Sequence, residues 1–351
     1  WSPVVPVVDL SRRGQRFSSA FAKAAERVAA SGSFLLGAEL SAFETEFAQW
    51  LDARRCVAVS SGASALQLAL AAAGIGRGDE VIVPAFTAVP TASAVAALGA
   101  VPRAADVDRG SGCLSTAGLQ AAVTARTAAV IVVHLYGYPA DLPTTDLPII
   151  EDAAQAHGAL RDPGRSIASA YSFYPTKNLG GIGDGGAVVT NDDALADRVR
   201  TLRVHGMTEQ YVHELVSQNF RMSEVEAAWL RLALPELTSD IERRRHIVAS
   251  YRQAAPDLQW QTSSPDHAYH LAVFRTTDRQ RTRAALEAAG VASAVHYPLA
   301  ITQQPAYREL DHAPCPEAEA WAAECLTVPC FPEMTESEVE RVCAALAGLA
   351  R

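Results

Sequence analysis

The chain has 351 residues, of which 49% are hydrophobic and 20% are charged, and its net charge at pH 7 is −9. This length allows two domains, or one large α/β domain with a smaller appendage, and the composition is typical of a globular protein with a substantial core. The negative charge and the lack of a dense basic stripe in the sequence argue against a nucleic-acid-binding protein. One basic run, at 243–246, is predicted to be a solvated helix face rather than an anion site.

The cysteines and the apolar runs indicate the cellular compartment of the protein. The six cysteines, at positions 56, 113, 315, 325, 330 and 343, form no CxxC pair and show no metal-ligand spacing. We therefore expect no disulfide framework and no metal site, which fits a reducing cytoplasm. No apolar run approaches the roughly 20 residues needed to cross a bilayer, so we expect no membrane partner.

Helix-like and strand-like runs alternate from about residue 40 to 235, which predicts a sheet wrapped by helices. Helices are expected at 42–51, 65–73, 223–234 and 241–254, and strands at 56–59, 80–83, 127–133, 148–150, 187–190, 270–275 and 292–297. The last helix is expected to begin with a capping box at Thr335–Glu338. We expect a large domain at 1–238, including an N-terminal arm, and a small C-terminal α+β domain at 239–351.

The first candidate site element is the predicted strand–turn–helix at 60–73. Its turn, Gly62-Ala63-Ser64, would direct free backbone N–H groups and the positive end of the helix dipole at an anion. The small residues allow the backbone to approach the anion closely, and Ser64 adds a hydroxyl. The segment fits equally well a helix that is merely capped by Ser61 or Ser64.

The second element is an apolar strand that ends in a carboxylate, Ile149-Ile150-Glu151-Asp152. Ligands of open α/β sheets bind at this edge, where Asp152 can pair with a protonated ring nitrogen. Gln155, one short turn onward, can hydrogen-bond a ring substituent. Taken alone, the acidic pair could also cap a helix.

The third element is Lys177, which follows Ser172 in an irregular loop rich in glycine. A lysine amine becomes a nucleophile when desolvation or a nearby cation lowers its pKa. Alone, such a lysine is more often exposed to solvent. An anion cradle, a carboxylate for a ring nitrogen and a lysine for a Schiff base, in this order, are together what pyridoxal 5'-phosphate requires.

The glycines at 181–186 also match the dinucleotide pattern G-x-G-x-x-G, which would indicate a nicotinamide oxidoreductase. That pattern needs a strand before the glycines and a helix after them. Here a β-branched run, Ala187-Val188-Val189-Thr190, comes after the glycines. The context is inverted, and we therefore reject a dinucleotide site.

Motifs along nearly the whole chain resemble the DegT/DnrJ/EryC1/StrS family of sugar aminotransferases, which are fold-type-I enzymes that use pyridoxal phosphate. The resemblance is carried by SSGASALQLAL, GDEVIVPAFTAVPTASAV, EDAAQAHGA, SFYPTKNLGGIGDGGAVVTND, QNFRMSEVEAAWL, VHYPLAITQQPAY and LTVPCFPEMTESEVERV. It implies an α/β fold with a mostly parallel mixed sheet between helices, and a homodimer in which each active site is completed by the neighbouring subunit.

The resemblance also implies roles for individual residues. Lys177 would carry the cofactor, Asp152 would pair with the pyridine nitrogen and Gln155 would lie near the ring hydroxyl. The family's phosphate contacts match Gly62, Ala63, Ser64, Ser172 and, supplied by the partner subunit, Asn219. Arg221 would serve either the site or only the dimer interface.

Three departures from the family pattern concern the surroundings of the cofactor. Ala88 stands where relatives carry an aromatic residue, so either Phe86 stacks on the cofactor instead or another group covers that face of the cofactor. The link at 140–148 lacks the helix that most relatives have. After His296 and Tyr297, which would lie near the substrate, the usual histidine is missing.

The activity implied is transfer of an amino group from an amino acid, glutamate or glutamine, to the ketone of a nucleotide-linked keto-deoxy sugar. Pyridoxamine 5'-phosphate would be the intermediate form of the cofactor. The alternatives are an aminotransferase for a cyclitol ketone or an aminobenzoate precursor, a sugar dehydratase, and a non-catalytic regulator that binds the cofactor. Lys177 argues against the dehydratase, because family dehydratases carry histidine there.

Overall fold

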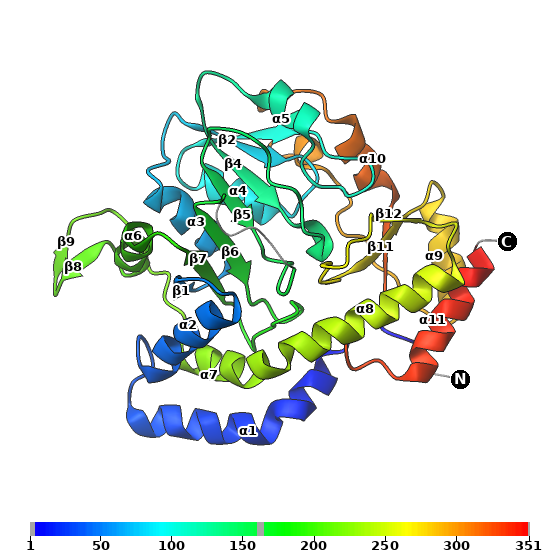
Figure 1. Ribbon diagram of the computed structural model, residues 1–351, viewed down its shortest axis with the longest axis horizontal. Coiled ribbons are helices and arrows are strands. Elements are labelled where there is room, and N and C mark those ends of the chain that lie inside the picture. The colour runs from blue at the N-terminus through cyan, green and yellow to red at the C-terminus, as the bar shows by residue number, and fades with distance from the viewer. Residues whose placement is uncertain (1–3, 160–164, 350–351) are drawn as a thin grey trace.

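The computed structural model describes residues 4–159 and 165–349. Its centre is a seven-stranded sheet of order β1-β7-β6-β5-β4-β2-β3 (Figure 1). Only β7 runs antiparallel to its neighbours within this sheet. The strands are β1 (Arg55–Val59), β2 (Glu80–Pro84), β3 (Val101–Ala105), β4 (Thr127–Val133), β5 (Ile149–Asp152), β6 (Ala168–Ser172) and β7 (Gly186–Thr190).

Both faces of the sheet are buried, which explains why its strands are apolar runs rather than alternating ones. Val57 and Val59 of β1 belong to one hydrophobic cluster, whereas Cys56 and Ala58 belong to another. Successive side chains of a strand point to opposite faces, so these two clusters are the two layers that enclose the sheet. Cys56 is buried and is a small core residue.

Helices supply the remainder of both layers. In chain order they are α1 (Leu10–Ser31), α2 (Ala38–Trp50), α3 (Gly62–Ala72), α4 (Val89–Ala96), α5 (Thr116–Ala122), α6 (Asp193–Arg203), α7 (Glu224–Ala233) and α8 (Leu237–Ala254), with short 3-10 turns at Leu135–Gly137 and Leu234–Glu236. In Figure 1, α1 lies along α7 at the edge of the molecule, and a hairpin of β8 (Met207–Glu209) and β9 (Val212–His213) projects beyond α6.

The C-terminal part has its own small sheet, of order β10-β11-β12. It consists of β10 (Gln259–Trp260), β11 (Ala272–Arg275) and β12 (Cys325–Val328), with α9 (Arg279–Ala288), α10 (Pro316–Glu324), α11 (Glu336–Leu349) and a 3-10 turn at Ile301–Gln303. The long helix α8 leads from the large sheet to this region (Figure 1). We propose the domain boundary at residue 238, the second residue of α8.

Most predicted elements of the large sheet are present, including the strand at 127–133 with its predicted bounds. The link at 140–148 contains no helix. The capping box is confirmed, because Glu338 accepts from the amide of Thr335, whose hydroxyl accepts from the amide of Glu338.

Two predictions were wrong. The segment 292–297 is not a strand, since Ala294 alone forms a bridge there, to Thr327. The basic run is not a solvated face either. Arg244 is only 2% exposed, because its guanidinium donates hydrogen bonds to the carbonyls of Tyr269, His270 and Cys330 inside the protein.

Candidate active site

The three predicted site elements meet at one edge of the large sheet. Strands β1, β5 and β6 run parallel, so their carboxyl ends lie on the same side. There they line a cavity of about 280 Å³, whose walls include Gly62, Ala63, Thr91, Asp152, Gln155, Ser172 and Lys177. The three elements, which are far apart in the sequence, therefore lie together in the structure.

Lys177 lies in the connection between β6 and β7, which is closed at its base. Ser172 and Gly186 are paired across the two strands, and the amide of Gly181 donates to the carbonyl of Phe173 at 2.7 Å. Arg13 from α1 donates to the carbonyls of Pro175 and Lys177, at 3.3 and 3.1 Å. The backbone on either side of the lysine is therefore fixed.

Protein atoms surround the ammonium group of Lys177. Its side chain is half-buried because it faces two cavities, but the protein atoms around it desolvate the charge. This desolvation lowers the pKa of Lys177 to about 8, against the opposing attraction of Asp152. An amine that loses its proton near neutral pH is suited to nucleophilic attack on a carbonyl.

Asp152 is 6% exposed at the end of β5. Its Oδ2 accepts a hydrogen bond of 2.8 Å from Thr91 Oγ1, and its Oδ1 accepts one of 3.2 Å from the amide of Ala154. Burial raises the pKa of Asp152, and the hydrogen bond from Thr91 opposes this effect. The carboxylate is thus oriented by neutral donors, and a cationic partner in the cavity would stabilise its charged form.

Gln155 is fixed at both ends of its amide. Its Oε1 accepts from the amide of Tyr136 at 2.5 Å, and its Nε2 donates to Tyr297 Oη at 2.7 Å. Because the amide oxygen takes the backbone donor, the orientation of the amide is defined. Gln155 lines the cavity together with Asp152.

The turn before α3 provides backbone donors at the cavity. Gly62 and Ala63 are the first residues of α3, where N–H groups have no acceptor within the helix. Ser61 caps the helix by accepting from the amide of Ser64, so the capping alternative is also realised. The Ser64 hydroxyl is bonded to Ser60 and Ser61 rather than facing the cavity.

Ser172 and Gly62 explain why a glycine is needed in this turn. A Cβ on Gly62 would lie 2.6 Å from the Cβ of Ser172, a distance that packed carbon atoms do not adopt. The glycine lets the N-terminus of α3 approach the end of β6, which brings the Ser172 hydroxyl to the same wall as the free amides.

Six of the expected site residues do not line this cavity: Ser64, Phe86, Asn219 and Arg221, and also His296 and Tyr297, which line a neighbouring chamber. Phe86 is fully buried and packs against Trp321, with ring centroids 5.6 Å apart. It is therefore a core residue, and Thr87 and Ala88 line the wall instead. Asn219 and Arg221 are bonded to each other at 2.8 Å, near the surface, and do not line the cavity of their own chain.

A second chamber of about 320 Å³ lies on the other side of Lys177. Lys177 and Tyr174 line both spaces, so the lysine stands between them. His296 and Tyr297 line this second chamber, together with Arg244 and His270, which the sequence did not single out as site residues. Arg244 was concealed in the basic run, and Thr91 of the first cavity carried no sequence signal.

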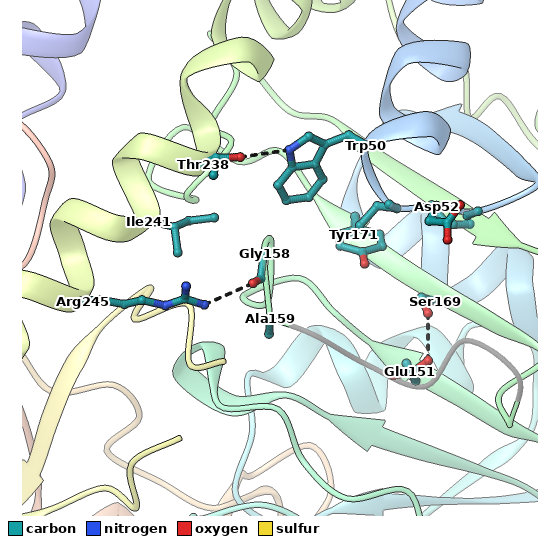
Figure 2. Close-up of a pocket in the computed structure, with 13 residues that line it drawn as sticks. Trp50, Asp52, Glu151, Gly158, Ala159, Ser169, Tyr171, Thr238, Ile241 and Arg245 are labelled. Atoms are coloured by element: carbon teal, nitrogen blue, oxygen red, sulfur yellow. Dashed lines mark hydrogen bonds between the residues drawn. The ribbon is translucent and has the colours of Figure 1, made fainter. Parts of the chain in front are cut away.

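A larger cavity, of about 460 Å³, lies on the opposite face of β5–β7 (Figure 2). Its walls are formed by the end of α2, by α8 and by side chains such as Trp50, Glu151, Ser169, Tyr171 and Arg245. Among the polar side chains drawn there, Ser169 donates to Glu151, Arg245 donates to the carbonyl of Gly158, and Trp50 donates to Thr238. We assign no chemistry to this cavity.

The fold and the lysine–aspartate cavity fit an aminotransferase of the α/β type. The chain belongs to the DegT/DnrJ/EryC1/StrS aminotransferase family, whose model matches residues 15–347. The family resemblance noted in the sequence is thereby confirmed.

Individual relatives cover almost the whole chain. It is 41% identical to the erythromycin biosynthesis sensory transduction protein EryC1 of Saccharopolyspora erythraea, with 97% of this chain and 98% of the relative aligned. It is 40% identical to the dTDP-3-amino-3,4,6-trideoxy-alpha-D-glucose transaminase of Streptomyces venezuelae, over 98% and 96%. The crystal structure of S. venezuelae DesV in complex with a ketimine intermediate superposes with a TM-score of 0.94 at 40% identity, covering 100% of this chain and 99% of that one.

Proposed function

We propose that the protein transfers an amino group from an amino acid, glutamate or glutamine, to the ketone of a nucleotide-linked keto-deoxy sugar, with pyridoxal 5'-phosphate as cofactor. The observation that carries the cofactor assignment is the placement of Lys177 and Asp152 on one cavity. The nucleotide-sugar assignment is supported by the named activity of the Streptomyces venezuelae transaminase.

The residues present fit this cofactor. The free amides of Gly62 and Ala63, with the Ser172 hydroxyl, suit a phosphate group. Asp152 would hold a pyridinium nitrogen, and Gln155 would lie beside the ring. Pyridoxal phosphate, when bound, supplies an electron-withdrawing ring that stabilises negative charge on the amino-acid carbon.

The protein's own groups would orient the reactants and move the proton. Lys177, whose pKa is about 8, is suited to take a proton from the carbon of the donor and return one at the cofactor, because its pKa is near the working pH. Asp152, whose carboxylate is oriented by Thr91, would pair with the ring nitrogen of the bound cofactor. Val7 and Val8 of the N-terminal segment wall the second chamber and help to exclude water there.

We also propose a homodimer with shared active sites. Asn219 lies near the surface and outside its own cavity, which fits a phosphate contact made across a subunit interface. Large exposed apolar side chains occur at Phe34, Leu35, Leu36 and Ile182, and a second copy could cover them.

Mixing the inactive variants Lys177→Ala and Asn219→Ala should restore activity, since a mixed dimer contains one intact site. Failure to restore activity, with dimers demonstrated by sedimentation, would contradict shared sites.

The activity can be tested through the absorption of the bound cofactor. The purified enzyme is converted to the pyridoxamine form with L-glutamate or L-glutamine, the donor is removed, and nucleotide keto-sugars and inosose ketones are added separately. We expect the cofactor to return to the aldehyde form with a nucleotide keto-sugar. Return only with an inosose would favour the cyclitol alternative, and cofactor binding without turnover with any ketone would favour a regulator.

The chain offers a matched control for the lysine. It contains two lysines, Lys177 and the exposed Lys23 of α1. Lys177→Ala should lose both the absorption band of the covalently held cofactor and turnover, whereas Lys23→Ala should retain both. Turnover by Lys177→Ala would refute the assignment.

A further inference from the structure

The second chamber contains a buried cation without an acidic partner. Arg244 is 2% exposed, and among the residues that the structure describes no carboxylate lies within 4.0 Å of its guanidinium. Its Nη1 donates to three backbone carbonyls, and its Nε has no hydrogen-bond acceptor within residues 4–159 and 165–349. A buried charge held only by neutral dipoles is costly unless an anion joins it.

His270 lies on the same chamber and is also incompletely satisfied. It is 6% exposed, and its Nδ1 has no partner in the described part of the chain. Burial and the nearby cations Lys177 and Arg244 lower its pKa well below the ordinary range. The ring is therefore neutral at pH 7 and carries one N–H that can donate to an anion without adding charge.

The other walls of the chamber favour a small anion. Its lining contains Lys177 and Arg244 but no aspartate or glutamate, and apolar contributions come from residues such as Leu271 and Val328. Arg244 lines this chamber, although almost none of its surface is exposed. A compact carboxylate can reach such depth, whereas a nucleoside diphosphate needs a long open groove.

We propose that Arg244 and His270 form the subsite for the carboxylate of the amino-acid donor, beside Lys177. This inference rests on the proposed function, since it gives the donor of that reaction a place. A carboxylate bound there would form charge-assisted hydrogen bonds with the guanidinium. The amino group of the same small molecule would then lie toward Lys177, which lines the chamber as well.

The test uses the holoenzyme and three variants. Arg244→Lys keeps the charge but removes the forked donor, and His270→Asn keeps a short polar side chain. Arg243→Lys is the matched control, because Arg243 precedes Arg244 in α8 and also donates to a backbone carbonyl, of Met334, but does not line the chamber. Binding of glutarate, an unreactive dicarboxylate, is measured by calorimetry. Apparent dissociation constants for L-glutamate and for the keto-sugar are measured in separate half-reactions.

We expect Arg244→Lys to weaken glutarate and L-glutamate by about tenfold or more, the usual effect of losing a charge-assisted hydrogen bond. His270→Asn should weaken both severalfold, and Arg243→Lys should change neither. The keto-sugar constant should stay within about twofold of wild type in all three. Melting curves and circular dichroism confirm that each variant is folded.

The proposal is overturned if folded Arg244→Lys and His270→Asn bind glutarate as wild type does. It is also overturned if both substrates weaken equally, which would indicate a structural role, or if the keto-sugar weakens more, which would assign the subsite to the diphosphate. If no nucleotide sugar is aminated but glutarate binding still depends on Arg244, the proposed acceptor is wrong and the carboxylate subsite stands.

Discussion

Glu151 and Asp152 are consecutive residues of β5 whose carboxylates serve opposite faces of the sheet. Asp152 accepts from Thr91 in the lysine cavity. Glu151 lies 2.6 Å from His134 Nε2, accepts from Ser169, and lines the cavity of Figure 2. The alternation of a strand thus assigns one carboxylate to the site and the other to a buried polar cluster. Exchanging the two roles would require a one-residue slip of the strand.

Removing the Thr91 hydroxyl should change the pH dependence of activity. Its hydrogen bond favours the charged form of Asp152, so Thr91→Val should raise the pKa of that carboxyl further above its ordinary value. The acid limb of the kcat profile should then move to higher pH. Thr87→Val is the control, because Thr87 bonds Thr91 at 3.0 Å but makes no bond to Asp152. An unchanged acid limb in Thr91→Val would show that Asp152 does not control it.

The amine of Lys177 should react at unusually low pH once the cofactor is removed. Because its pKa is about 8, the rate of modification by an amine reagent should rise with pH and reach half its maximum near pH 8. The Lys23→Arg variant leaves Lys177 as the sole lysine, and peptide mass spectrometry separates its modification from that of the α-amine. A midpoint above pH 10 would contradict desolvation of this amine.

Glu226 should lower the stability of the protein as pH rises. It is 4% exposed, and burial raises its pKa to about 7, against hydrogen bonds from the amides of Ile182 and Gly183. Between its ordinary pKa and about 7 the folded protein keeps a proton that the unfolded chain releases, so the free energy of unfolding falls over this range. The effect of such a shift is on the order of 3 kcal/mol.

Glu226→Gln removes this titration and keeps an oxygen acceptor for the two amides. Relative to wild type, the variant should gain unfolding free energy between pH 5 and pH 8, measured by urea titration at both values. Glu242→Gln, on the exposed side of α8, should show no such gain. Parallel pH dependences for Glu226→Gln and wild type would refute the prediction.

A methyl group on Gly62 should weaken cofactor binding. It would lie 2.6 Å from the Cβ of Ser172, so the start of α3 must move away from β6 and its amides with it. Overpacking of this kind typically costs about 1–3 kcal/mol. We expect Gly62→Ala to raise the dissociation constant of pyridoxal phosphate at least about fivefold, in line with that cost. Gly76→Ala, where a Cβ meets nothing within 4 Å, should bind normally.

Local patterns sufficed to predict much of the large sheet and the meeting of its site elements. The run Thr127–Val133 is apolar because both faces of β4 are buried, and Asp152 stands at the strand end where its carboxylate faces the cavity. The strand after the glycines, β7, has the position that excluded a dinucleotide loop. At these positions the residues nearby in the sequence determine the local structure.

Arg244 and Phe86 could not be placed in this way, because distant segments determine their surroundings. The carbonyls that bury Arg244 belong to residues 269, 270 and 330, so nothing within the basic run distinguishes it from Arg243. Phe86 packs against Trp321 of α10, more than two hundred positions away. Only the tertiary packing decides which cation is buried and which ring joins the core.

The closed base of the β6–β7 loop has a consequence for timing. Strand pairing holds Ser172 and Gly186, and Arg13 holds the carbonyl of Lys177. The backbone therefore holds Lys177 in place. Any movement of its amine between the donor carbon and the cofactor must come from rotation about the side-chain bonds. Such rotations take picoseconds to nanoseconds in exposed side chains, whereas loop movements extend to microseconds. Movement of the Lys177 amine therefore places little limit on the rate of proton transfer.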